Sequence, residues 1–361
     1  MLDLRGLRKS LKGRLKRGDF RGAALYLAAL QTRDPQPETA VQLAQMQIRC
    51  RTYMDALAQL RREHRQWPGN VALLRMLAET AMLAQNLDEA AQAWLDLIAA
   101  HPPDAPYPVL RALACLRATH QHDRAQDMLS VQGERLRKYM ARAAVRMLRK
   151  GRWSDTDIPR GLYLVSGNNG TGKSTLGHFL HAMGYHIIDA DTEIASFSTQ
   201  NRFSDLRYDL LRATGASETD LRWSWPDIRV THSFAAARKR KEPVFVIGGH
   251  GATVAPYIPR FRQVFHLTVP DDVIAARLAK RNSISHKVGS RGYLAALKRN
   301  ARAQIPDYAA TLIEADRPVW AVCADVLAAI KANAATVPAA GSPAPAKTSA
   351  GAPSLSHQAY G

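Results

Sequence analysis

The sequence predicts two folds in one chain, an all-α solenoid in the N-terminal half and an α/β domain with a five-stranded parallel sheet behind it. Two observations predict this division. A short segment recurs four times before residue 130, and five apolar runs after residue 160 alternate with helical segments. Strands that alternate with helices are typical of a parallel sheet covered on both faces.

The composition is that of a folded chain. Its 361 residues suffice for two or three domains, and 46% of them are apolar. No stretch approaches the roughly 20 apolar residues that cross a bilayer, so we expect no transmembrane segment. The scattered cysteines Cys50, Cys115 and Cys323 have neither metal-ligand nor disulfide spacing. They indicate a reducing compartment, and we expect a cytoplasmic protein.

The formal net charge of +19 is concentrated in two basic segments. In the first, Leu4, Leu7, Leu11 and Leu15 recur at helical spacing, which predicts a basic amphipathic helix over residues 1–17. The second gives a basic connecting helix and linker over residues 131–157. These basic faces are either solvated or a surface for nucleic acid, anionic lipid or an acidic partner, and charge alone does not choose among these.

The recurring segment of the N-terminal half contains matched alanines 33, 34 and 35 residues apart, at Ala23, Ala56, Ala90 and Ala125. Small alanines permit close helix packing, and the prolines that follow the first three segments end each second helix. Residues 18–130 therefore resemble degenerate tetratricopeptide repeats, and a generic alanine-rich bundle is the alternative. The resemblance implies a concave surface that binds a protein partner.

The apolar run 161–166 leads into a complete G-x-x-x-x-G-K-[ST] motif, and a helical segment follows. This is the strand, loop and helix context that a phosphate-binding loop (P-loop) requires, so we predict that the chain binds ATP and Mg²⁺. Lys173 should reach the β- and γ-phosphates and contribute to catalysis, and the Ser174 hydroxyl should bind Mg²⁺. The expected nucleotide-binding residues of this region are Gly167, Asn168, Asn169, Gly170, Thr171, Gly172, Lys173, Ser174 and Thr175.

The next apolar run, residues 184–191, ends in a D-x-D pair, Asp189 and Asp191. Here the sequence resembles shikimate kinase, dephospho-CoA kinase and the nucleoside-monophosphate kinases. The resemblance implies two catalytic carboxylates: Asp189 holds Mg²⁺ or takes the acceptor proton, and Asp191 faces the acceptor. The alternative is that either side chain caps a helix that begins near Thr192.

The third run, residues 243–247, is followed by Gly248, Gly249 and His250. Mechanical ATPases place an acidic residue at this strand end, so the glycine favours a small kinase. The resemblance implies that Gly248, Gly249 and His250 contact the acceptor. His250 is equally well explained as a solvated loop residue.

Two later strands, at 260–270 and 310–314, complete the expected sheet. After the fourth strand, a helix carries Arg277 and Arg281 and leads into a polar, lid-like segment. The resemblance implies that a lid arginine, Arg281, closes on the transferring phosphoryl group, and that Arg317 lies beside the adenine. Trp223 and Trp225, in the segment before the third strand, either stack on an acceptor or anchor the core.

These observations predict a P-loop kinase-like domain over residues 158–333 and a disordered Ala/Pro/Ser tail over 334–361. The expected reaction is transfer of the γ-phosphoryl group of ATP to a hydroxyl or phosphate of a small acceptor. The basic charge keeps open a 5′-polynucleotide kinase or another nucleic-acid-linked NTPase. The repeats keep open a scaffold whose P-loop domain is a nucleotide-dependent switch.

Overall fold

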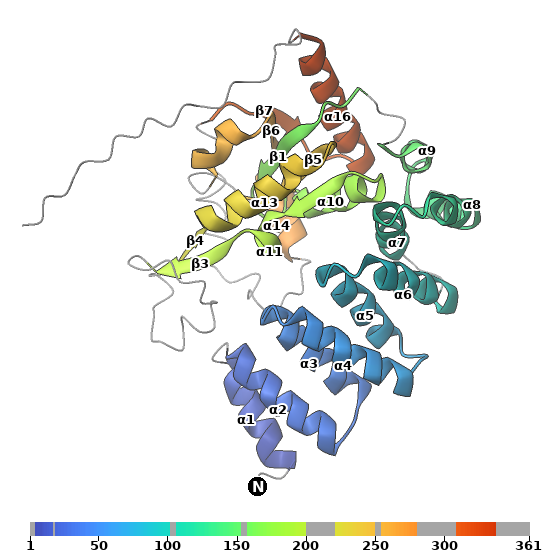
Figure 1. Cartoon of the computed structure of the whole chain (residues 1–361), viewed down its shortest axis with the longest axis vertical. Helices are drawn as coiled ribbons and strands as arrows, with labels where there is room; N and C mark the ends of the chain where they lie inside the picture. Colours follow the sequence, from blue (N-terminus) through green and yellow to red (C-terminus); the bar gives the residue numbers. More distant parts are fainter. Residues whose placement is uncertain are drawn as a thin grey trace, which may run out of the picture.

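The computed structural model describes residues 4–16, 19–101, 106–152, 157–199, 221–249, 254–279 and 308–336. Helices precede the first strand throughout this part (Figure 1). They are α1 (Leu4–Lys16), α2 (Phe20–Arg33), α3 (Pro37–Arg49), α4 (Tyr53–Gln66), α5 (Val71–Leu83), α6 (Leu87–Ala100), α7 (Tyr107–Ala118), α8 (His122–Tyr139) and α9 (Arg142–Lys150). The predicted all-helical N-terminal half is therefore confirmed.

The helices stack in chain order, each packing on the next from α1 to α8. The turn inside three successive pairs holds a residue in the left-handed region, namely Arg51, Gln85 and His120 with φ of 52°, 60° and 60°. In each turn the N–H of the following residue donates to a carbonyl five residues earlier. This repeated turn, which the sequence does not reveal because none of the three residues is glycine, sets the same angle within each helix pair.

The N-terminal helix α1 forms part of this array. Leu7 and Leu11 are buried against Ala23 and Leu27 of α2, so the apolar stripe of α1 packs against the next helix of the array. At the other end, α8 runs without a break through residue 130, and the basic segment divides into the end of α8 and a separate helix α9.

The α/β domain contains a parallel sheet in the order β2-β5-β1-β6-β7, which confirms the five predicted strands. Its strands are β1 (Gly161–Gly167), β2 (His186–Asp189), β5 (Pro243–Ile247), β6 (Gln263–Thr268) and β7 (Thr311–Glu314). Its helices are α10 (Lys173–Ala182), α11 (Ala190–Glu193), α13 (Asp227–Lys239), the 3-10 helix η4 (Ala255–Arg260), α14 (Asp271–Ala279) and α16 (Val319–Thr336). An antiparallel pair, β3 (Ser196–Thr199) with β4 (Leu221–Ser224), was not predicted.

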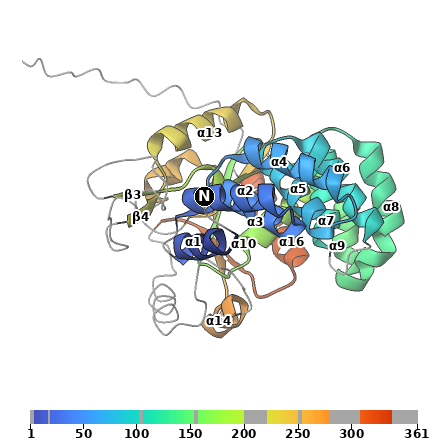
Figure 2. The same cartoon turned by 90° about the horizontal axis from the view of Figure 1, so that it is seen from below.

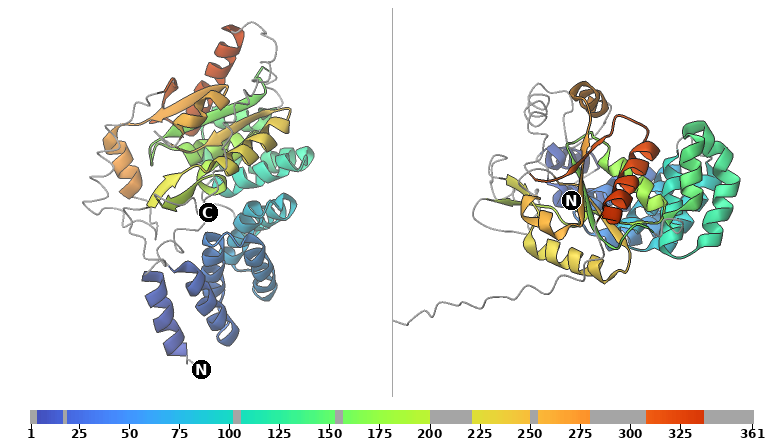
Figure 3. Two further views of the ribbon diagram at one scale, coloured as in Figure 1. Left: turned by 60° about the vertical axis from the view of Figure 1, so that its left-hand side comes forward. Right: turned by 90° about the horizontal axis from the view of Figure 1, so that it is seen from above.

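The two faces of the sheet join different cores because alternate strand residues point to opposite sides. Leu162 and Leu164 pack with α13, whereas Tyr163 and Val165 share a cluster with α10, α16 and the repeats. Figure 2 shows α13 on one side of the sheet and α10 with α16 on the other. The repeats, blue to teal in Figure 3, lead away from this second side. The repeats and the α/β domain are thus joined by one hydrophobic core.

Arg117 of α7 strengthens this junction. Its side chain is buried, and its guanidinium donates hydrogen bonds to the carbonyl oxygens of Ala182, at the end of α10, and Leu148, near the end of α9. A cation at two helix C-termini is favourable because the last carbonyls of a helix carry partial negative charge.

Within the described residues, none of the helices is long and apolar enough to cross a membrane.

Candidate functional site: the phosphate-binding loop and its surroundings

The predicted loop lies between the central strand β1 and helix α10. Gly170 and Gly172 have φ of 89° and 96°, and Gly167 has φ of 143°. A Cβ on Gly167 would lie 2.9 Å from the carbonyl oxygen of Leu267 and 2.9 Å from Thr171 Oγ1. The motif glycines are therefore required by the backbone path, which curls the loop around the N-terminus of α10.

Lys173 is hydrogen-bonded through its side chain to the backbone of this loop. Its side chain is 9% exposed, and its Nζ donates hydrogen bonds to the carbonyl oxygens of Gly167 at 2.7 Å and Asn168 at 2.8 Å. Thr171 Oγ1 also donates to the Asn168 carbonyl, at 2.8 Å. Ser174 and Thr175, in the first turn of α10, are exposed. A curled backbone, a lysine and an exposed hydroxyl at a helix N-terminus fit a triphosphate with Mg²⁺.

A cavity of about 330 Å³ lies next to the loop. Its walls come from the loop and α10, from the end of β6, and from the segment that joins β7 to α16. The lining is partly apolar and partly polar, and it includes Gly170, Thr175, Leu176, Leu267, Val319 and Val322. Its volume and its partly apolar lining suit an organic ring system held beside bound phosphates.

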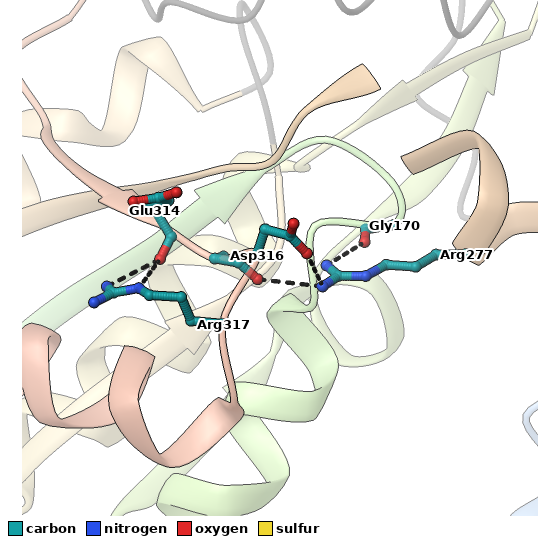
Figure 4. A network of polar contacts seen from close by, with 6 residues as sticks. Gly170, Arg277, Glu314, Asp316 and Arg317 are labelled. Atoms are coloured by element: carbon teal, nitrogen blue, oxygen red, sulfur yellow. Dashed lines mark hydrogen bonds and ion pairs between the residues drawn. The ribbon is translucent and has the colours of Figure 1, made fainter. Parts of the chain in front are cut away.

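Two arginines border this cavity (Figure 4). Arg277 of α14 donates through Nη1 to the Gly170 carbonyl at 3.3 Å, and its Nη2 lies 3.1 Å from the Asp316 carboxylate. Arg317 donates to the Glu314 carbonyl at 3.1 Å and is paired with Asp325. Arg317 lines this cavity, and its place beside the adenine stays a prediction. Arg277 ties the lid-side helix to the loop, a contact that the sequence did not indicate.

Asp189 ends β2, two strands away from the loop, because β5 lies between β1 and β2. Its Oδ1 accepts a hydrogen bond from the Asp191 N–H at 3.1 Å, so Asp189 is the N-cap of α11. The capping alternative therefore describes what Asp189 does here. Burial raises the pKa of Asp189, and the neighbouring charge of Asp191 raises it further.

Asp191 was expected at the end of the strand, but it lies in the first turn of α11 and is exposed. The chain turns into the helix as soon as Asp189 caps it, two residues earlier than expected. Glu193 of the same helix returns a hydrogen bond, because its Oε1 accepts from the Asp189 N–H at 2.8 Å. The pair is similar to a capping box, but Glu193 follows Asp189 by four residues and not by three, so the usual sequence spacing does not indicate it.

The glycines after β5 bring their backbone close to this carboxylate pair. Gly248 has φ of 132°, and a Cβ on it would lie 3.2 Å from Asp191 Oδ1. Gly249 has φ of 74°, and a Cβ there would lie 2.7 Å from the indole of Trp225. Asp189, Asp191 and both glycines thus gather at one edge of the sheet.

Trp225 is 3% exposed and stacks on Tyr257, with ring centroids 5.9 Å apart, so the structure shows it as a core anchor. The predicted site residues His250 and Arg281 lie outside the described residues, as does the side chain of Trp223.

No protein-family model and no curated protein sequence matches the chain. Several solved structures are similar to parts of it. MamA of AMB-1 has a TM-score of 0.34 and 18% identity and covers 49% of this chain and 87% of its own. A gluconokinase from Sinorhizobium meliloti 1021 has a TM-score of 0.33 and 17% identity, with coverage of 49% and 95%. A tetratricopeptide repeat protein from Parabacteroides merdae has a TM-score of 0.35 and 12% identity, with coverage of 82% and 97%. Because these scores are low, the fold rests on this chain's own strand order and helix pairing.

Proposed function

We propose that the α/β domain is an ATP-dependent kinase that transfers the γ-phosphoryl group to a hydroxyl or phosphate of a small acceptor. One observation carries the proposal. The edge of the sheet that holds the phosphate-binding loop also holds, one and two strands away, a glycine pair and two carboxylates. This arrangement supports the proposal, because groups that would bind a triphosphate then lie next to groups that would contact a second reactant.

Each residue then has a role that its position supports. The loop backbone and Lys173 would bind the phosphates, with Lys173 exchanging its two carbonyl partners for phosphate oxygens. Ser174 and Asp189 would hold Mg²⁺, which offsets the phosphate charge when bound. Asp189 has a raised pKa, as suits a group that takes a proton from an acceptor hydroxyl. Asp191, Gly248, Gly249 and His250 would contact the acceptor, and Arg281 would stabilise the transferring group.

The cavity beside the loop would take the adenine, with Arg277 and Arg317 at its border. The repeats would bind a protein partner. A second candidate function is a nucleotide-dependent switch, in which nucleotide binding would change the conformation of the repeats. One specific contact favours it: α7 of the repeats packs on α10, the helix that begins in the loop.

The test is a coupled ADP-release assay on the full chain, with ATP alone and with sugars, nucleosides, nucleotides, shikimate and oligonucleotides as acceptors. We expect release above the ATP-only rate with one acceptor class. Asp189→Asn should keep ATP affinity, measured by calorimetry, and lower transfer by roughly 10²–10⁴-fold. Lys173→Ala should lose ATP affinity. Failure of the wild-type chain to bind ATP would contradict the proposal, and binding without acceptor-dependent release would favour the switch.

A further inference from the structure

The amino ends of the parallel strands form the edge of the sheet that lies away from the phosphate-binding loop. Strand β1 separates the two edges, because Gly161 begins it and Gly167 ends it, about 20 Å apart at roughly 3.3 Å per residue. Since the strands are parallel, the segments that lead into β1, β5 and β6 meet at this far edge. Their exposed cations, here called the basic edge, are Arg149 and Lys150 at the end of α9, Arg160 before β1, Arg238, Lys239, Arg240 and Lys241 before β5, and Arg260 and Arg262 before β6.

Contacts between these segments make the basic edge one continuous surface. On one side of β1, Glu242 Oε2 lies 2.7 Å from Nη2 of Arg152, two residues after α9, and Glu242 Oε1 accepts from Arg240 at 3.2 Å. On the other side, a Cβ on Gly161 would lie 3.4 Å from Arg262 Cδ, so the Arg262 side chain lies over the start of β1. The basic segment that follows the repeats therefore continues onto the α/β domain.

The protein itself leaves much of this positive charge without a counter-charge. Glu242 and Asp157 are the carboxylates in the described part of these segments, and Glu242 is already shared between two arginines. Within the described residues, four cations of the basic edge have no ion-pair partner, namely Arg160, Lys239, Lys241 and Arg262. Like charges gathered on one surface repel each other and create a positive potential that attracts a polyanion.

The side chains of the basic edge fit a row of phosphates better than other anionic surfaces. Most of them are arginines, and a planar guanidinium can bind a phosphate through two parallel N–H bonds. The described part of this surface contains no exposed aromatic or large aliphatic side chain. It therefore offers no group that enters a lipid bilayer or stacks on an unpaired base, whereas the backbone of a duplex requires neither.

We propose that the basic edge binds the phosphate backbone of a double-stranded nucleic acid without reading its sequence. The surface lies at the opposite edge of the sheet from the phosphate-binding loop, so the duplex is a docking partner and not the phosphoryl acceptor. This inference goes beyond the proposed kinase function and does not depend on it.

The test is fluorescence anisotropy of a labelled duplex of roughly 20 base pairs and mixed sequence, titrated with the full chain between about 50 and 200 mM salt. We expect saturable binding that weakens with salt by about 0.9 logarithmic units per logarithmic unit of salt for each phosphate contacted. Changing Lys239→Gln, Lys241→Gln and Arg262→Gln together should weaken binding by roughly tenfold or more and lower the salt slope by about three.

Two further variants serve as controls. Lys239→Arg, Lys241→Arg and Arg262→Lys together keep the charge and should keep the affinity. Arg21→Gln, Arg62→Gln and Arg65→Gln together remove the same charge from exposed positions of the repeats and should leave the affinity and the slope unchanged. Circular dichroism checks that each variant is folded.

Absence of saturable duplex binding by the wild-type chain would overturn the inference. An equal loss in the repeat control and in the basic-edge variant would also overturn it, because net charge alone would then explain the binding. Tighter binding to phosphatidylserine vesicles, or to polyglutamate as a competitor, than to the duplex would replace the nucleic acid by a membrane or an acidic protein. ATP binding, measured by calorimetry, should be the same in all variants, and its absence from the wild-type chain would contradict the kinase and not this inference.

Discussion

Arg277 Nη1 lies 3.3 Å from the carbonyl oxygen of Gly170, so helix α14 is hydrogen-bonded to the phosphate-binding loop. The same guanidinium also contacts the Asp316 carboxylate at 3.1 Å, as Figure 4 shows. A single side chain thus links the loop, the segment after β7 and the helix that leads to the predicted lid. Nucleotide binding in the cavity would act on all three at once.

The first prediction follows from this contact. Arg277→Ala should weaken ATP binding by roughly tenfold or more, because both the support of the loop and a positive charge near the phosphates are lost. Arg277→Lys should retain only part of the ATP affinity, since a single ammonium group cannot bind the Gly170 carbonyl and the Asp316 carboxylate together as the planar guanidinium does. Calorimetry with ATP measures the effect, with Arg238→Ala, at an exposed position of α13, as the control. Unchanged affinity in Arg277→Ala would show that the contact has no part in nucleotide binding.

The second prediction concerns the glycines after β5. Gly249→Ala should lower the free energy of unfolding by about 1–3 kcal/mol, because a Cβ would lie 2.5 Å from Val254 Cγ1 and φ is 74°. Gly69→Ala is a matched control, since a Cβ there meets nothing within 4 Å. Urea denaturation of both variants measures the difference. Equal stability would mean that the backbone at Gly249 adapts without cost.

The sequence predicts much of this architecture because its signals are local. The motif from Gly167 to Ser174 lies between an apolar run and a helix, and that order places the loop. The 33- to 35-residue spacing of the alanines likewise gives the helix pairs. Asp189 and Gly248 could be assigned to neighbouring strand ends because parallel strands present their C-termini at one edge.

The contacts between distant segments could not be predicted in this way. Arg117 pairs with Ala182, 65 residues away, and Arg51 with Ala195, 144 residues away. Neither arginine lies in a pattern that indicates its partner. The leucines of α1 show the same limit: their spacing predicts an amphipathic helix, but the partner that buries Leu7 appears only in the fold.

The third prediction is a dependence of stability on pH. Burial, together with the nearby charge of Arg111, lowers the pKa of His178 to about 4 and that of His181 to about 3. The unfolded chain takes up these protons near pH 6.5, so it binds more protons than the folded chain between about pH 6.5 and 4. Stability should therefore fall as the pH is lowered through this range.

The slope of this loss is at most about 1.4 kcal/mol per pH unit for each histidine. Urea midpoints measured between pH 7 and pH 4.5 test it. His178→Gln should flatten the profile, whereas His232→Gln, at an exposed position of α13, should not. A profile that is unchanged in His178→Gln would show that this histidine is protonated in the folded chain as readily as in the unfolded one.

The last prediction addresses whether the repeats and the α/β domain unfold as one unit. Arg117→Met should lower the free energy of unfolding by roughly 2–4 kcal/mol, because the carbonyl oxygens of Ala182 and Leu148 lose a charged donor inside the junction. Burial lowers the pKa of Arg117 to about 10, so the side chain is still a cation at neutral pH and its loss removes a charge as well as two hydrogen bonds. One apolar cluster extends from Ala40 to Ile330, so the repeats and the α/β domain of the wild-type chain should unfold in a single transition. Circular dichroism follows mainly the repeats, and loss of nucleotide binding follows the α/β domain. The two transitions should coincide. Arg117→Met should shift both transitions together, and Arg124→Met, on the outer face of α8, should shift neither. If only the α/β transition moved, the shared core would not couple the two parts, and α7 would be a docking surface between independently folding units.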